Sequence, residues 1–470
     1  MITPPTVLKF GGTSVEDARA FERVARIVLA CGADEAPVVV VSAMCRVTDA
    51  LLSSFKLAAE EGRAEDAALA LEEHFDRHKA VAGALLKEDD SAAFEATLGR
   101  ARCELRALLQ AAATETNERA ALQDEVVSYG ERLSADLLAG VLRGVGSRGA
   151  QHVDARRCIV TDEQFGQAEP DMTLTTSAMR AEVVPILEAG EIPVLGGFIA
   201  STPEGMTTTL GRGGSDYTAA IVGAALSARE IQIWTDVSGV LTADPRVVER
   251  ARSIPRLSYA EAAELAYFGA KVLHPKTILP AVVRSVPVRI CNSRAPESES
   301  TVINFDTDAT PHTVKAIAHK RGVSIVHVTS ARMLGAYGFL RALFEVFDRH
   351  RTVVDLVTTS EVSVSLSLDG THALDQIVRD LESIGAVKVE HGRALICVVG
   401  EGLRDARGVA AKIFTAVRDI NVMLISQGAS SINLTFVVDE SQAEAAVRQL
   451  HEAFFEQNTR ELYQTAAADD

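Results

Sequence analysis

The chain has 470 residues, which is too long for one ordinary domain, so two or three domains are expected. Hydrophobic residues make up 47% and charged residues 24% of it, a composition that supports a buried core and excludes a disordered chain. The net charge of −17 argues against a nucleic-acid-binding protein. An anionic ligand would therefore need local cationic or N–H groups, because the overall field does not attract it.

The cysteine pattern and the apolar runs bear on the compartment. The six cysteines are scattered, without the spacing of a metal site or a disulfide framework. The N-terminus lacks the pattern of a signal peptide, and no apolar run approaches the length of a membrane span. These features predict a cytoplasmic protein with reduced thiols and with neither a membrane nor a nucleic acid as partner.

The first three hundred residues alternate short β-branched runs with helical patterns. The predicted strands are almost continuously apolar, as in a parallel sheet covered on both faces: Val7–Phe10, Pro37–Ser42, Ile192–Ile199 and Glu230–Thr235. The predicted helices are Val15–Ala30, a long region from about Asp49 to Arg119, Glu125–Leu142, Thr218–Leu226 and Tyr259–Phe268. This order predicts an α/β fold with a largely parallel sheet.

The last third of the chain contains an internal repeat. The polar, proline-containing stretch Asn304–Arg321 predicts a domain boundary ahead of this repeat. Beyond this boundary, Phe344–Asp369 aligns without gaps on Phe414–Asp439, at an offset of 70 residues. Each copy is predicted to contain a helix, a strand, a polar turn and an alternating strand. Duplicated modules of this size indicate a binding module or an assembly surface.

The stretch KFGGTS places a lysine and two glycines at the end of the first predicted strand, where open α/β sheets bind ligands. The glycines at 11 and 12 let the backbone approach a phosphate. The N–H groups at the start of the next helix, together with Lys9, then form an anion site. A tight turn beside a solvated lysine is the alternative interpretation. The chain contains neither a Walker A loop nor a dinucleotide GxGxxG motif.

A second glycine loop, TTTLGRGGSDYTAA from Thr207 to Ala220, also opens a helix. Arg212 in this loop is able to clamp a carboxylate with two parallel hydrogen bonds. Asp216 is either a functional residue or a charge that complements the helix dipole. Two glycine-rich helix starts that carry Lys, Arg and Asp favour a phosphoryl-transfer site for two substrates.

Two further stretches follow in the same order: a strand that runs into a loop, IWTDVSGVLTADPRVV, and FGAKVLHP. Taken alone, Lys271 in the latter is equally well a solvated cation. Thr48 follows another predicted strand and either serves a site or caps a helix. Glu125 and Glu131 lie on an amphipathic helix, where most glutamates face solvent.

These stretches together resemble the aspartate kinases, and most of all the monofunctional, lysine-sensitive type. The likeness covers nearly the whole chain. It implies an amino-acid-kinase fold followed by two α+β ACT (ferredoxin-like) domains. The implied reaction is phosphorylation of the side-chain carboxylate of L-aspartate by ATP with Mg²⁺, the first step towards lysine, methionine and threonine. A homodimer or a dimer of dimers, assembled through the ACT domains, is also implied.

The resemblance assigns roles to single residues. Lys9 and Asp216 match the catalytic pair of the family. The positions that match aspartate-binding residues are Thr48, Glu125, Arg212 and Ser215. The positions that match nucleotide contacts are Lys9, Gly11, Gly12, Thr13, Ser14, Thr235, Asp236, Leu241, Arg246, Lys271 and Val272. No residue is assigned as a direct metal ligand, since Mg²⁺ is expected mainly on the nucleotide phosphates.

The tail matches the inhibitor-binding segments of the family. The matching positions are Met333, Ala336, Gly338, Phe339, Leu340, Val354, Asp355, Ser360 and Glu361. Ala336 stands where lysine-sensitive relatives often have a polar residue, so lysine, threonine or both remain possible inhibitors. The alternative interpretation is that each of these residues, taken singly, is an ordinary sheet or helix-end residue that binds no inhibitor.

We expect four segments: a catalytic domain at 1–305, a linker at 306–322, a first ACT domain at 323–390, and a second at 391–470 whose end returns to complete the first. Two alternatives to an aspartate kinase remain. One is a kinase of another small acid, such as glutamate or a carbamate. The other is a catalytically inactive amino-acid sensor.

Overall fold

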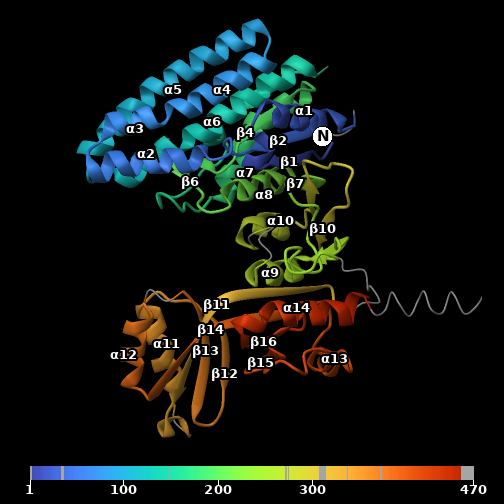
Figure 1. Ribbon diagram of the computed structural model, residues 1–470. Coiled ribbons are helices and arrows are strands. Elements are labelled where there is room, and N and C mark those ends of the chain that lie inside the picture. The colour runs from blue at the N-terminus through green and yellow to red at the C-terminus, as the bar shows by residue number, and fades with distance from the viewer. Residues whose placement is uncertain are drawn as a thin grey trace, which may run out of the picture. The chain divides into compact units, whose positions relative to one another are not determined.

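The computed structural model describes residues 3–32, 36–146, 148–269, 273, 275–305, 314–335, 337–370 and 373–456. The chain forms two compact units (Figure 1). The first unit comprises Met1–Val240, Pro255–Tyr259 and Val272–Thr307, and the second comprises Leu241–Ile254, Ala260–Lys271 and Asp308–Asp470. Among the described residues, no helix combines the length and the apolar character that a membrane span requires.

The first unit is built on a mostly parallel sheet, as predicted. The described strands form an eight-stranded sheet in the order β3-β4-β2-β1-β7-β9-β10-β8. Their bounds are β1 (Thr6–Phe10), β2 (Pro37–Val41), β3 (Ala150–Val153), β4 (Ile192–Gly196), β7 (Glu230–Thr235), β8 (Arg256–Ser258), β9 (Val288–Asn292) and β10 (Thr301–Asn304). All pairs are parallel except β9 with β10. The central strands β1 and β2 are buried at every position, which explains their continuous apolar sequence.

Helices cover both faces of this sheet. On one face lie α1 (Ala18–Ala30) and α6 (Arg119–Val145), and on the other lie α7 (Met172–Glu188), α8 (Gly214–Leu226) and α10 (Leu279–Val283) (Figure 1). The long helical region predicted from Asp49 to Arg119 consists of α2 (Val47–Glu61), α3 (Ala64–Ala70), α4 (Glu72–Leu85) and α5 (Glu88–Thr114), and these helices pack around α6. Short 3-10 helices occur at η1 (Gly12–Val15), η2 (Ala155–Arg157) and η3 (Pro275–Ile278).

Two local predictions in the first unit need correction. The predicted strand Ile192–Ile199 is broken, because Phe198 adopts a left-handed φ of 68°. The chain continues as β5 (Ile199–Ser201), which pairs with β6 (Thr207–Thr209) in a separate hairpin. The helix predicted from Val15 begins only at Ala18, where the Asp17 side chain accepts a hydrogen bond from the Ala20 N–H and caps it.

The second unit contains a six-stranded antiparallel sheet in the order β12-β13-β11-β14-β16-β15. Its strands are β11 (Ala316–Thr329), β12 (Val354–Thr359), β13 (Ser363–Asp369), β14 (Ala386–Val399), β15 (Leu424–Gln427) and β16 (Asn433–Asp439). Its helices are α9 (Tyr259–Tyr267, whose first residue belongs to the first unit), η4 (Ala331–Met333), α11 (Phe339–Arg349), α12 (Leu374–Glu382), α13 (Val409–Ala416), η5 (Glu440–Gln442), α14 (Ala443–His451) and η6 (Glu452–Glu456).

The two ACT-like modules share strands, which changes the expected boundaries. Strands β11 and β14 pair with each other along most of their length, with a register shift around Gly322. One half of each strand packs in a core with α11 and α12, and the other half packs with α13 and α14. The expected boundary at 390/391 therefore falls inside β14, and residues 316–322 of the expected linker already belong to β11.

The order of insertion is also the reverse of our expectation. The returning helix α14 packs with Ile317 at the start of β11 and with Ile396 and Phe436, in the core of the second module. The residues at the start of β11 thus complete the second module. The first module is inserted between the two parts of the second. Because β11 enters and β14 leaves through both modules, the second module is discontinuous in the sequence, whereas the first is one contiguous stretch from the second half of β11 to the first half of β14.

Candidate active site

The first two glycine motifs meet at the carboxyl edge of the sheet. Lys9 is the fourth residue of β1 and is only 8% exposed. Its Nζ lies 2.6 Å from Oδ1 of Asp216, which stands in the first turn of α8. The contact is an ion pair. It shows that Asp216 does more than complement the dipole of its own helix.

The loop after β1 approaches the loop after β2 closely. A Cβ at Gly12 would lie 3.1 Å from the Ala43 carbonyl oxygen, so a side chain there would push the loops apart. The Gly11 N–H donates to the Trp234 carbonyl at the end of β7, and the Ser14 hydroxyl lies 2.8 Å from that of Ser293. The predicted anion site at a helix start is corrected in one respect: the glycines lead into η1, ahead of α1.

A pocket of about 700 Å³ opens over this edge. It brings together most of the residues predicted to bind substrate or phosphate, namely Lys9, Gly12, Thr13, Thr48, Arg212, Ser215 and Asp216. Further lining residues come from the loop after β2, from α6 and from the β5–β6 hairpin, among them Ser42, Asp124, Glu131 and Thr209. Arg212 is exposed and forms no ion pair with any described residue.

Glu131 is the buried acid of this pocket. It is 3% exposed, and burial raises the pKa of its carboxyl from 4.5 to about 8, although hydrogen bonds from Ala43 N–H and the Thr48 hydroxyl act in the opposite direction. Its Oε2 has no hydrogen-bond partner among the described residues. A buried carboxylate oxygen without a donor is a suitable acceptor for a ligand ammonium group.

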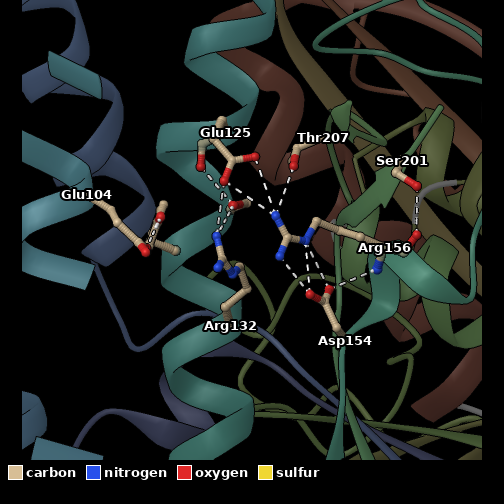
Figure 2. A network of polar contacts seen from close by, with 9 residues as sticks. Glu104, Glu125, Arg132, Asp154, Arg156, Ser201 and Thr207 are labelled. Carbon is tan, nitrogen blue, oxygen red and sulfur yellow. Dashed lines mark hydrogen bonds and ion pairs between the residues drawn. The ribbon is translucent and has the colours of Figure 1, made fainter. Parts of the chain in front are cut away.

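Glu125, in contrast, is not among the residues that line the pocket. Figure 2 shows its polar contacts. Glu125 lies among arginines: Arg132 donates to Oε1 at 3.1 Å, and Nη1 of Arg156 lies 3.4 Å from both carboxylate oxygens. Arg156 also donates to the Asp154 carboxylate and to the Thr207 hydroxyl. Glu125 is therefore paired within the protein and lies outside the residues that line the pocket, and its assignment to the substrate stays a prediction.

Helical geometry explains why Glu131, and not Glu125, lines the pocket. Asp124, Val127 and Glu131 are spaced three and four residues apart on α6, so they share the face that lines the pocket. Glu125 is rotated about 100° from Asp124 and faces Arg132 instead. This periodicity was readable in the sequence, and it would have placed Asp124, which the sequence analysis did not name, and Glu131 on the pocket face.

The predicted nucleotide contacts are only partly gathered. Thr235 ends β7 and Asp236 follows it, and the Thr235 carbonyl accepts from Ser293. Leu241 and Arg246 belong to the second unit, and Arg246 is paired with Asp244 at 2.6 Å. Lys271 and Val272 lie outside the described residues. These four assignments stay predictions.

The predicted inhibitor residues lie in the first ACT-like module, apart from Ala336, which is outside the described residues. Asp355 of β12 is held firmly: Lys320 donates to its Oδ2 at 2.9 Å, and the Tyr267 hydroxyl donates to its Oδ1. Glu361 is exposed in the turn before β13, next to Ser360, whose hydroxyl lies 2.7 Å from that of Ser363. The remaining candidates are Met333, Gly338, Phe339, Leu340 and Val354 at η4, α11 and β12.

Comparison with known proteins gives a consistent family. Residues 4–292 match the amino acid kinase family, and residues 396–454 match an ACT domain. Lysine-sensitive aspartokinase 3 of Escherichia coli (strain K12) is 39% identical over 462 residues, which cover 96% of this chain and 99% of that protein. The chloroplastic aspartokinase 3 of Arabidopsis thaliana is 38% identical over 468 residues, covering 97% and 82% of the two chains.

Solved structures agree. The crystal structure of E. coli aspartokinase III in complex with aspartate and ADP (R-state) superposes with a TM-score of 0.80, at 39% identity over 96% of this chain and 100% of that one. The same enzyme in complex with lysine and aspartate (T-state) gives the same values. Clostridium acetobutylicum aspartate kinase gives a TM-score of 0.82 at 26% identity, with coverage of 96% and 100%.

Proposed function

Because this chain belongs to the aspartokinases, enzymes of the amino acid kinase family that phosphorylate the side-chain carboxylate of L-aspartate with ATP, we propose that this transfer takes place in the pocket around Lys9. The observation that carries the proposal is the buried ion pair between Lys9 and Asp216, which lies in the same pocket as Arg212. The sequence alternatives of a glutamate-like kinase and of an inactive sensor are outcomes of the assay below.

The pocket offers a cationic side chain for the α-carboxylate of an amino acid and an acidic side chain for its α-ammonium group. Arg212 is exposed and suited to the α-carboxylate, which a guanidinium holds with two parallel hydrogen bonds. Glu131, and not Glu125, is suited to the ammonium group, through its unpartnered Oε2. Thr48 and Ser215 line the same space and supply hydroxyl groups. The substrate's side chain is then free to point towards Lys9.

The chemistry requires no general base. A carboxylate with an ordinary pKa of about 4 is already ionised at neutral pH and attacks the γ-phosphorus directly. The protein has to align the two anions and offset their charge, and Lys9 is placed for this by Asp216. Gly11, Gly12, Thr13 and Ser14 would let the backbone approach the phosphates.

We also propose that Mg²⁺ reaches the site on the nucleotide. The described residues contain no group of three or more His, Cys, Asp or Glu side chains that would hold a metal ion. Coordination by the nucleotide phosphates fits such a site, and the ion would supply further positive charge to the transferring group.

The test is ADP release coupled to an optical readout, with hydroxylamine present to trap the acyl phosphate. L-Aspartate should give ADP and hydroxamate in equal amounts, and L-glutamate should give neither. Release with glutamate alone would identify the glutamate-like kinase. No release with any small acid would identify a sensor and contradict the proposed site.

We propose in addition that lysine inhibits this enzyme at the first ACT-like module. A lysine-sensitive relative at 39% identity supports this, as do the acidic side chains of Asp355 and Glu361 beside the predicted segments. Assembly into homodimers or dimers of dimers through these modules is part of the proposal. It is supported by large exposed apolar side chains there, such as Leu334 and Val353, each 67% exposed. Light scattering after size exclusion would measure the oligomer.

A further inference from the structure

Asp124 lies in the pocket but is occupied entirely by backbone and hydroxyl donors. It is 2% exposed, and its Oδ2 accepts from the N–H groups of Gly166 and Thr209, each at 2.8 Å. Its Oδ1 accepts from the Thr209 hydroxyl at 2.9 Å. These bonds join α6 to the loop that holds Gly166 and to the end of β6, 42 and 85 residues later in the chain. Charge-assisted bonds to a buried carboxylate are among the stronger hydrogen bonds in proteins.

Both of these segments adjoin the loop that carries Arg212. Arg212 follows Thr209 by three residues, and it stands between Gly211 and Gly213, each with a left-handed φ of 73°. Two glycines give this segment a mobile backbone unless it is anchored nearby. A Cβ on Gly211 would lie only 3.1 Å from the Gly166 carbonyl oxygen, so Gly166 forms the wall against which the loop turns. Asp124 thus fixes both the start of the loop and its wall.

The same turn of α6 also holds the other end of β6. Glu125 binds Arg156, which donates to the Thr207 hydroxyl at 3.1 Å (Figure 2). The Thr208 hydroxyl, between these two anchors, lies 2.7 Å from that of Thr161. Every hydroxyl of the strand Thr207–Thr209 is therefore used to fix it, and the two adjacent acids of α6 hold its two ends.

We propose that Asp124 is a positioning residue of the kinase, which sets the place of Arg212 by holding Thr209 and Gly166. It acts on aspartate binding through Arg212 and makes no contact with the nucleotide. The inference rests on the proposed role of Arg212 in binding the substrate's α-carboxylate. The adjacent Glu125 pairs with Arg156, which donates to Thr207 at the other end of the same strand.

The test compares Asp124→Asn and Thr209→Val with the wild type, at a temperature where melting curves show all of them folded. An asparagine removes the negative charge that strengthens these bonds and sets its NH₂ group against the Thr209 hydroxyl, which then no longer donates to residue 124, and a valine removes that hydroxyl at similar volume. We expect the KM for aspartate to rise by about tenfold in each, with the KM for ATP nearly unchanged. Thr209→Ser, which keeps the hydroxyl, is the matched control and should restore most of the affinity.

A double-mutant cycle with Arg212→Ala separates positioning from general damage. If Asp124 acts through Arg212, adding Asp124→Asn to Arg212→Ala should cause little further loss in kcat/KM for aspartate. Full additivity, or an equal rise in both KM values, would overturn the inference. If Asp124→Asn does not fold, the Thr209 pair alone decides. A wild type without aspartate-dependent ADP release would refute the proposed function, and an unchanged KM in Arg212→Ala would refute the role of that arginine.

Discussion

Lys9 is held in the pocket by its ion pair with Asp216, so removing its ammonium group should affect the transfer step specifically. Replacing Lys9 with alanine leaves Asp216 without its counter-charge and removes positive charge from the phosphoryl group in transfer. We expect kcat to fall by about 100- to 1000-fold. Lys56→Ala is a matched control, because that side chain is 71% exposed and pairs only with Glu60. Near-full activity of Lys9→Ala in the ADP-release assay would refute the phosphate-site assignment.

Glu131 makes aspartate binding depend on pH. In the empty pocket its carboxyl has a pKa of about 8, and a substrate ammonium favours the ionised form. Below this pH a proton must leave before the substrate binds, so the KM for aspartate should fall as the pH rises from about 6 to 8. The expected slope is up to tenfold per pH unit, and KM should become constant above 8. Steady-state kinetics over this range measures it.

The Glu131→Gln variant provides the control, since an amide does not titrate. Its KM for aspartate should be high and independent of pH. The free enzyme gives a second readout: native Glu131 keeps a proton that the unfolded chain releases above 4.5, so this group makes the free energy of unfolding decrease between pH 4.5 and 8. A KM profile that stays the same in both proteins would show that Glu131 does not bind the ammonium.

The residue scale also shows where sequence reasoning failed. Lys9, Arg212 and Asp216 were identified correctly as neighbours, because glycine loops at strand ends and helix starts carry their own signature. Glu125 was assigned to the substrate by the match of a local stretch to the family, whereas Glu131 lies on the helix face that lines the pocket. A helical side chain's role depends on its angle around the axis, and two glutamates six residues apart point in different directions.

At the scale of elements, the internal repeat was the most accurate sequence signal. Helices α11 and α13 begin at Phe339 and Val409, and strands β13 and β16 span Ser363–Asp369 and Asn433–Asp439, each pair at the offset of 70 found in the sequence. Strands that pass through both modules, β11 and β14, escaped detection. Sequence similarity locates repeated units, but it does not reveal which strand each unit takes from its neighbour.

The close approach of the loops after β1 and β2 gives a prediction for these elements. Alanine at Gly12 would place its Cβ 3.1 Å from a backbone oxygen of the opposite loop, which has to move. Alanine at Gly11 meets its nearest atoms at 3.7 and 3.9 Å, an ordinary contact. We expect kcat/KM to fall clearly more in Gly12→Ala than in Gly11→Ala. Equal losses would show that the spacing of the loops is not what the second glycine preserves.

For the whole molecule, the sequence predicted the order of functions along the chain but not how the chain divides. Leu241–Ile254 and Ala260–Lys271 precede the expected boundary, yet they belong to the second unit. Two polar contacts link α9 to the ACT-like part of the chain: Lys315, just before β11, forms a buried pair with Glu261 at 2.7 Å, and Asn433 at the start of β16 donates to Glu264. Such long-range polar pairs leave no local pattern in the sequence.

The contact between α9 and the predicted inhibitor residues yields a prediction about regulation. Asp355 has a side chain only 2% exposed, and both of its oxygens are occupied, by Lys320 and by the Tyr267 hydroxyl. An inhibitor ammonium that binds Asp355 must therefore compete with a residue of α9. Tyr267→Phe removes one competitor and should lower the lysine concentration needed for half-inhibition, with little change in the uninhibited rate.

Asp355→Ala and Glu361→Ala act in the opposite direction, because each removes an acceptor for the inhibitor. Both should raise the half-inhibiting concentration, and Tyr267→Phe combined with Asp355→Ala should behave like Asp355→Ala alone, since the tyrosine then has no carboxylate to occupy. Inhibition curves against lysine, threonine and both together decide this for all four proteins. If Tyr267→Phe weakened inhibition, α9 would stabilise the inhibited arrangement, and Asp355 would have to bind the tyrosine and the ligand at the same time.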